Sequence, residues 1–207
     1  MKKLFVFDMD GTLLPKTTSL LEIAKVIGKI EEMESLETQY YQKQIDPMTL
    51  AKSIHEFCKT VSHEIVRSAF ELTPKLNNIR EVLKRIMDEG NVSCLVTASP
   101  NFFADHFYDY GFDNIFASRP FSLNEDHFTP EHIIFPKDKP VIVKQLCEKL
   151  QIPFEQTVAF GDSLTDVPLF QSLKHTISVN GDHHIKDHAK HYYTGMDLME
   201  AYLLHLL

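Results

Sequence analysis

The N-terminal stretch constrains the fold of this chain most strongly. Residues 4–14 read LFVFDMDGTLL, so four apolar residues lead directly into Asp8 and Asp10. Such a short apolar run is typical of a strand buried in a parallel sheet. Ligands of open α/β sheets bind in the crevice beyond the carboxyl ends of the strands. We therefore expect Asp8 and Asp10 at that edge, where their charge needs a counter-ion such as a metal.

An Asp-x-Asp-Gly sequence has two other common interpretations. Asp and Gly are frequent turn residues, so the stretch could be only a strand followed by a turn. It could also begin an EF-hand calcium loop, but Pro15 and Lys16 stand where further oxygen ligands should follow. The rest of the chain has to decide between these interpretations and a catalytic site.

The remaining chain alternates between apolar strands and amphipathic helices, which predicts a doubly wound parallel α/β sheet. Residues 20–72 carry helical periodicity and no convincing strand, with cap signals at Thr18 or Ser19, at Asp46 before Pro47, and at Ser62. We expect a core domain of residues 1–14 and 74–207 and a helical insert of residues 15–73. Further strands are expected at residues 92–97, 114–117, 157–160, 176–179 and 191–193, a helix at 101–110, and short strands near Phe121 and Ile133 in the irregular segment 121–136.

Composition narrows the class of protein. The 207 residues suit one core domain with a small insert, and the net charge of −8 with no basic stripe argues against nucleic acid or an acidic membrane as a partner. Three scattered cysteines fit reduced thiols rather than a disulfide framework. The apolar run after Met1 stops at Asp8, too early for a signal peptide, and no stretch approaches a membrane span. We therefore expect a cytoplasmic protein.

Polar residues of complementary kinds follow three of the predicted strands. The set comprises Asp8, Asp10, Thr97, Asp162, Asp166 and Lys139, the last at the start of the helix before the fourth strand. In a parallel sheet these strand ends meet at one edge. Oxygen ligands favour Mg²⁺, and Mg²⁺ with a lysine and a hydroxyl suits a phosphoryl group in its transition state. A carboxylate can then attack phosphorus and form an acyl phosphate.

These residues resemble the motifs of the haloacid dehalogenase superfamily of phosphohydrolases. The sequence DMDGTL at residues 8–13 is similar to its first motif, Thr97 to the second, Lys139 to the third, and GDSLTD at residues 161–166 to the fourth. The order and spacing cover nearly the whole chain. The position of the helical insert and the stretch IFASR at residues 115–119 resemble the phosphoserine-phosphatase-like branch.

The resemblance implies a Rossmann-like core with a small α-helical cap, and it implies roles for the motif residues. Asp8 would be the nucleophile, and Asp10 would protonate the leaving alcohol and then activate water. Mg²⁺ would be held by the Asp8 carboxylate, the Asp10 backbone carbonyl and Asp162. Asp166 would assist the metal through water or orient Lys139.

The resemblance also implies which residues contact the substrate. Thr97 and Lys139 would hold the phosphoryl oxygens, although Lys137 and Lys144 compete with Lys139 for this role. The remaining expected contacts are Gly11, Thr12, Ala98, Ser99 and Thr165.

Some residues of the insert are candidate substrate contacts on their residue type alone. Tyr40, Tyr41 and Phe57 could face the substrate, but helix packing explains them equally well. Lys43 and Arg67 could contact an anionic substrate or could simply be exposed.

Three departures from the branch bear on the substrate. Phosphoserine phosphatases carry an amine-binding acid shortly after the first motif, where this chain has Thr17, Thr18 and Ser19, and its first acid is Glu22. The second motif reads Thr-Ala-Ser instead of Ser-Gly-Gly, and the fourth has Thr165 instead of Asn. These changes leave the phosphoryl chemistry intact and do not support L-phosphoserine.

We therefore predict a Mg²⁺-dependent phosphomonoester hydrolase acting on a small phosphorylated metabolite. A phosphotransferase or mutase on the same scaffold is the alternative enzyme, and a non-catalytic phosphate-binding regulator is the alternative from another class. His184 and His188 are four residues apart, but no further ligand accompanies them, so we interpret them as a solvated polar face.

Overall fold

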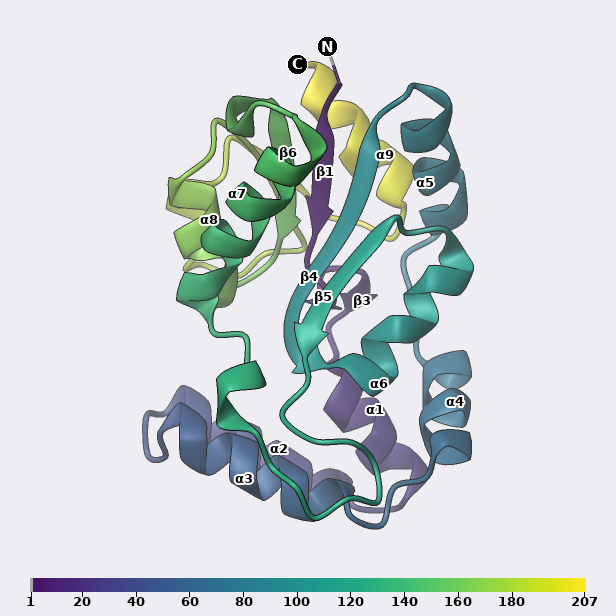
Figure 1. Cartoon of the computed structure of the whole chain (residues 1–207), viewed down its shortest axis with the longest axis vertical. Helices are drawn as coiled ribbons and strands as arrows, with labels where there is room; N and C mark the ends of the chain where they lie inside the picture. Colours follow the sequence, from purple (N-terminus) through teal and green to yellow (C-terminus); the bar gives the residue numbers. More distant parts are fainter. Residues whose placement is uncertain (1) are drawn as a thin grey trace.

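The central sheet determines where the predicted site residues lie. In the computed structural model, which describes residues 2–207, six parallel strands run in the order β5-β4-β1-β6-β7-β8 (Figure 1). The strands are β1 (Leu4–Phe7), β4 (Val92–Pro100), β5 (Asn114–Ser118), β6 (Thr157–Gly161), β7 (His175–Val179) and β8 (His191–Tyr193). The predicted doubly wound parallel sheet is confirmed. Phe7 pairs with Leu95 on one side and Phe160 on the other, so the segment after β1 leaves the sheet between β4 and the segment after β6.

Helices cover both faces of the sheet because the β1 side chains alternate between them. Phe5 and Phe7 belong to one apolar cluster, with α5 (Ile79–Asp88), α6 (Asn101–Ala104) and α9 (Leu198–Leu203). Leu4 and Val6 belong to the other, with α7 (Lys139–Leu150) and α8 (Val167–Gln171). The result is a three-layer α/β/α core.

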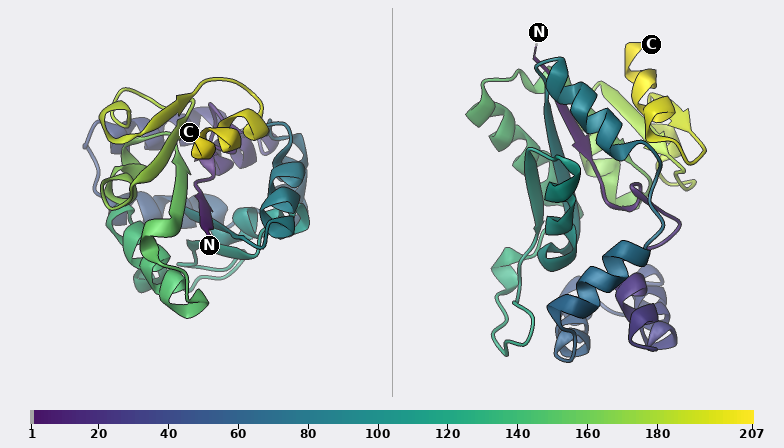
Figure 2. Two further views of the ribbon diagram at one scale, coloured as in Figure 1. Left: turned by 90° about the horizontal axis from the view of Figure 1, so that it is seen from above. Right: turned by 90° about the vertical axis from the view of Figure 1, so that its right-hand side faces the viewer.

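The helical insert consists of four helices that lie beyond the carboxyl edge of the sheet (Figure 1; Figure 2, right). They are α1 (Ser19–Val26), α2 (Ile30–Tyr41), α3 (Pro47–Cys58) and α4 (His63–Leu72). Thr18, rather than Ser19, caps α1, and Asp46 and Ser62 cap α3 and α4 as expected. The chain returns to the core where it left, because the Leu76 N–H donates to the Leu13 carbonyl at 3.0 Å. The division into core and insert domains stays a prediction.

Short elements complete the chain. Residues 10–15 form an unexpected two-stranded parallel ladder of β2 (Asp10–Gly11) and β3 (Leu14–Pro15). The predicted helix at 101–110 is α-helical only in α6 and continues as a 3₁₀ helix. The 3₁₀ helices are η1 (Asp105–Tyr110), η2 (Pro130–His132), η3 (Pro136–Asp138), η4 (Phe154–Gln156), η5 (Leu164–Asp166), η6 (Lys186–His188) and η7 (Leu204–Leu206). Within residues 2–207, no helix has the length and apolar character needed to span a bilayer.

The expectation of strands near Phe121 and Ile133 was wrong. Residues 119–138, called loop 119–138 below, hold only the two 3₁₀ turns η2 and η3. Three prolines in this segment lack the N–H that a strand ladder needs, and the loop instead closes on itself through the Thr129 N–H to the Pro120 carbonyl at 2.6 Å. It descends from β5 to α3 (Figure 1), where a ring nitrogen of His55 lies 2.9 Å from the Glu125 carbonyl oxygen.

Candidate active site

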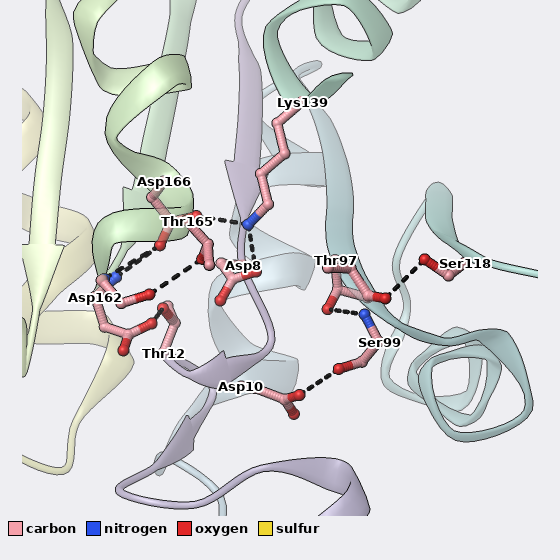
Figure 3. Close-up of polar contacts among 12 residues, drawn as sticks. Asp8, Asp10, Thr12, Thr97, Ser99, Ser118, Lys139, Asp162, Thr165 and Asp166 are labelled. Carbon is pink, nitrogen blue, oxygen red and sulfur yellow. Dashed lines mark hydrogen bonds and ion pairs between the residues drawn. The ribbon is translucent and has the colours of Figure 1, made fainter. Parts of the chain in front are cut away.

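The sheet gathers the predicted motif residues at one edge. Asp8 directly follows β1, and its N–H donates to the Phe160 carbonyl at 3.0 Å, which fixes it beside the end of β6. Thr97 lies in β4, and Asp162 directly follows β6. Figure 3 shows these side chains converging with those of Lys139 and Asp166, as the sequence predicts.

Lys139 joins two of the aspartates. Its Nζ lies 2.7 Å from an oxygen of Asp8 and 2.7 Å from an oxygen of Asp166, and all three residues are buried. Burial alone would lower the pKa of Lys139, but the two carboxylates outweigh it and raise the pKa above its usual value. The competing candidates Lys137 and Lys144 are exposed. Lys139 is therefore the lysine that reaches the site.

Asp166 has both carboxylate oxygens engaged. One accepts from Lys139, and the other accepts from the backbone N–H groups of Asp162 at 3.0 Å and Ser163 at 3.4 Å. A Cβ at Gly161 would lie 2.5 Å from the Asp166 carboxyl carbon, so the glycine makes this approach possible. Of the two roles expected for Asp166, the contacts favour orienting Lys139.

Asp162 is positioned by the first motif. The Thr12 hydroxyl donates to one Asp162 oxygen at 2.9 Å. Gly11 has φ +79°, and a Cβ there would lie 2.1 Å from the other Asp162 oxygen. Thr12 is fully buried and does not line the cavity described below. The structure therefore places Thr12 in contact with Asp162 and not at the expected position of a substrate contact.

A divalent cation fits this carboxylate group. Oxygens of Asp8, Asp162 and Asp166 lie within 4.8 Å of one another. Burial and then repulsion from Asp166 raise the pKa of Asp8 to about 7, and the same causes raise the pKa of Asp162. The single charge of Lys139 does not balance the three carboxylates, so a net negative charge remains buried. A site whose ligand atoms are all oxygens suits Mg²⁺. The histidines at 184 and 188 join no such group within residues 2–207.

Asp10 stands apart from the carboxylate group. One of its oxygens accepts from the Ser19 N–H at 2.8 Å, and the other accepts from the hydroxyls of Ser19 and Ser99. Burial raises the pKa of Asp10 despite these bonds. Ser99, expected as a substrate contact, therefore also holds Asp10. The Ser19 contact was not predicted, because a helix-capping pattern does not reveal a contact to another segment.

The end of β4 forms the opposite wall. The Ser99 N–H donates to the Thr97 hydroxyl oxygen at 3.1 Å. The Ser118 hydroxyl donates to the Ala98 carbonyl at 2.7 Å (Figure 3). It also accepts from the Ile134 N–H at 2.9 Å. Ser118 thus ties β4 to loop 119–138. This role of Ser118 was not predicted from the sequence.

A cavity of about 440 Å³ opens above these residues. Its walls come from the sheet edge, from helices of the insert, and from loop 119–138. Of the expected residues, it is lined by Asp8, Asp10, Gly11, Thr97, Ala98, Ser99, Lys139, Asp162, Thr165, Tyr40 and Tyr41. Phe57 packs in the core instead, and neither Lys43 nor Arg67 lines the cavity.

Two glutamates of the insert differ in their access to this cavity. Glu22 is buried outside it, between the Thr17 hydroxyl at 2.5 Å and the Lys25 ammonium at 2.6 Å. Glu37 lines the cavity and accepts from the Thr18 hydroxyl at 2.6 Å. Glu37 was not predicted as a site residue, because nothing in its spacing distinguishes it from the other acids of α2.

Comparison with known proteins decides the family. Residues 5–171 match the haloacid dehalogenase-like hydrolases. The chain belongs to this family. The match covers the four motif regions that carry the site, so the predicted hydrolase class and the predicted fold are confirmed.

The relatives also confirm the resemblance to the phosphoserine-phosphatase-like branch. A phosphoserine phosphatase of Methanocaldococcus jannaschii is 25% identical over 175 residues, which cover 82% of this chain and 82% of the relative. One of Archaeoglobus fulgidus is 23% identical over 90% of this chain, which spans only 55% of that relative. A solved structure described as a phospho-aspartyl intermediate analogue of phosphoserine phosphatase superposes with a TM-score of 0.82 at 23% identity, covering 100% of this chain and 99% of that one.

Proposed function

We propose that this member of the family is a Mg²⁺-dependent phosphomonoester hydrolase that works through an aspartyl phosphate on Asp8. The proposal rests on the contacts of the two Asp8 carboxylate oxygens. One oxygen is held by Lys139, and the other accepts no hydrogen bond from residues 2–207, while the residue lines the cavity. A carboxylate held in this way has one oxygen available for attack on phosphorus. The relatives named phosphoserine phosphatase support the same class of ester as substrate.

The reaction would proceed in two displacements. The free Asp8 oxygen attacks phosphorus, the bond between phosphorus and the ester oxygen breaks, and Asp10 gives its proton to the departing alkoxide. A water molecule then attacks phosphorus, Asp10 takes a proton from it, and the acyl phosphate bond breaks. Inorganic phosphate leaves, and both carboxylates return to their initial states.

The neighbouring residues support these steps. The raised pKa of Asp10 favours its protonated form before the first displacement, and the bonds from Ser19 and Ser99 fix its position. Lys139, Thr97 and the N–H of Ala98 would hold the phosphoryl oxygens, and Gly11 and Thr165 would complete the pocket floor. Mg²⁺ bound by Asp8, Asp162 and the Asp10 carbonyl would neutralise charge on the phosphoryl group. The helical insert would act as a cap that excludes bulk water.

Phosphate release from para-nitrophenyl phosphate tests the proposal. We expect release in Mg²⁺, loss of release in excess EDTA, and loss of steady-state release in Asp8→Asn and Asp10→Asn. Asp187→Asn is the matched control, since Asp187 is exposed. Normal release by Asp8→Asn would contradict the proposal. A mutase would release little free phosphate, and a non-catalytic regulator would bind a phosphate mimic without turnover.

A further inference from the structure

The wall of the cavity opposite the catalytic aspartates is mainly apolar, with one carboxyl group in it. Side chains from α1, α2 and α3 face this part of the cavity, and loop 119–138 closes it. The apolar lining residues there include Leu21, Met33, Tyr40, Leu50, Ile54 and Phe121. The carboxyl group is that of Glu37 on α2.

Glu37 is hydrogen-bonded through only one of its two carboxylate oxygens within residues 2–207. Its Oε1 accepts from the Thr18 hydroxyl at 2.6 Å, and the same hydroxyl oxygen accepts the Leu21 N–H at 3.2 Å as the cap of α1. Both hydrogen-bonding functions of Thr18 are therefore used in fixing α1 and Glu37. Within residues 2–207, Oε2 of Glu37 accepts no hydrogen bond. This oxygen is available to a ligand.

No cation of the cavity compensates Glu37. Among residues 2–207, no arginine lines the cavity, and its lysines are Lys16 and Lys139. Lys139 is already paired with Asp8 and Asp166, and Lys16 is exposed. None of the ion pairs within the described part of the chain includes Glu37. Burial and the charge of Asp10 raise the pKa of Glu37 to about 7, which is the expected result for a carboxyl group without a counter-ion.

We propose that Glu37 is a specificity-determining residue that pairs with an ammonium group on the leaving alcohol of the substrate. The substrate would be a phosphate monoester of an amino alcohol with an apolar or aromatic body and no carboxylate. The inference rests on the proposed function, because the phosphate must occupy the site at Asp8 for the alcohol to reach Glu37.

The chemistry of the cavity favours a cation over other groups at this place. An ammonium group would satisfy Glu37 and would lie near the rings of Tyr40 and Tyr41, whose faces attract cations. A carboxylate on the leaving alcohol would face Glu37, and among residues 2–207 the unpaired lysine lining the cavity is Lys16, whose exposed charge is screened by solvent, so this arrangement is unfavourable in a partly buried site. The apolar walls accommodate a hydrocarbon body. Amino acid phosphates such as phosphoserine carry the disfavoured carboxylate.

A matched series of para-substituted phenyl phosphates tests the inference. The substituents are aminoethyl, hydroxyethyl, propyl and carboxyethyl, so that the phenol leaving group stays nearly constant while the charge of the tail changes. We measure kcat/KM for the wild type, for Glu37→Gln, and for Glu34→Gln as the control, since Glu34 is an exposed acid on the same helix.

We expect the wild type to prefer the aminoethyl ester over the propyl ester by about tenfold or more, the size of one charge-assisted contact. Glu37→Gln should lose this preference mainly through KM and retain turnover of the propyl ester, which also shows that it folds. Glu34→Gln should behave as the wild type.

The outcomes separate the two proposals. No hydrolysis of any ester by the wild type would overturn the proposed function and this inference with it. Hydrolysis of the propyl ester without a charge preference, or an aminoethyl preference that survives in Glu37→Gln, would overturn the inference alone. A wild-type preference for the hydroxyethyl ester over the aminoethyl ester would overturn the assignment of an ammonium group.

Discussion

The ammonium nitrogen of Lys139 lies 2.7 Å from an oxygen of Asp8, and the two residues are only 1% and 5% exposed. One residue follows the first strand and the other begins the helix before β6, 131 positions later. Because both charges are buried, each depends on the other, and the proposed nucleophile and its nearest cation form one unit.

Removal of this cation should affect both activity and stability. Lys139→Met leaves Asp8 and Asp166 without their shared partner, so we expect a loss of about 3–5 kcal/mol in the free energy of unfolding at pH 8 in EDTA. Phosphate release should fall at least about a hundredfold. Urea denaturation and initial rates measure the two effects. Lys144→Met, an exposed position on the same helix, should match the wild type, and equal stability of Lys139→Met would refute the assigned pairing.

Gly11 offers a second test, because a side chain there would collide with Asp162. Gly11→Ala places a methyl group 2.1 Å from an Asp162 oxygen, and we expect activity and Mg²⁺ binding to be lost. Gly90→Ala is the control, since Gly90 also has positive φ but nothing lies within 4 Å of its Cβ position. It should cost about 1–2 kcal/mol of stability and leave activity unchanged. Similar activity losses in both variants would mean that strain alone explains the effect.

Metal binding should stabilise the fold through Asp162. We expect Mg²⁺ to raise the melting temperature, because a ligand at a hundred times its Kd adds about 2.7 kcal/mol. Asp162→Asn should abolish this shift, and Asp187→Asn should retain it. Thermal unfolding in EDTA and in Mg²⁺ measures the difference. A full Mg²⁺ shift in Asp162→Asn would place the ion elsewhere.

Glu37 should make stability depend on pH. Its pKa in the folded protein is about 7, above the ordinary 4.5, so the folded state binds this proton more tightly than the unfolded state. Its contribution is therefore favourable below pH 4.5 and is lost as pH rises toward 7. Glu37→Gln lacks this pH-dependent contribution. The stability of Glu37→Gln relative to the wild type should therefore increase from pH 5 to pH 8, by at most about 1.4 kcal/mol for each unit by which the pKa of Glu37 differs between the folded and unfolded states.

Chemical denaturation in EDTA at the two pH values measures this change. Working in EDTA keeps metal binding out of the comparison. Glu31→Gln, which replaces an exposed acid on the same helix, should show the same pH dependence as the wild type. A relative stability of Glu37→Gln that is constant with pH would show that the pKa of Glu37 is not raised in the folded protein.

The sequence was sufficient to predict those parts of the site that depend on strand ends. Asp8, Thr97 and Asp162 follow or end apolar runs, and parallel pairing necessarily brings such positions to one edge. The expected helix start favoured Lys139 over Lys137, but the sequence does not show their difference in burial, which arises only where η3 turns into α7.

Contacts between distant segments could not be predicted from the sequence. Ser118 bonds to Ala98, and Ser99 bonds to Asp10 across 89 positions, and neither contact has a periodic signal. Glu37 lines the cavity and is held there by the Thr18 hydroxyl, a contact between residues 19 positions apart. Loop 119–138 is held by its own hydrogen bonds and by α3, which strand propensity near Phe121 and Ile133 does not reveal.

The chemical identity of the phosphorylated residue tests the proposed mechanism most directly. Asp10→Asn should accept phosphate from para-nitrophenyl phosphate, whose leaving group needs no proton, and should then stall because no base activates water. Acid quenching followed by peptide mass spectrometry should find a hydroxylamine-sensitive phosphoryl group on Asp8. Phosphate on another residue, or turnover without any phosphorylated protein, would contradict the mechanism.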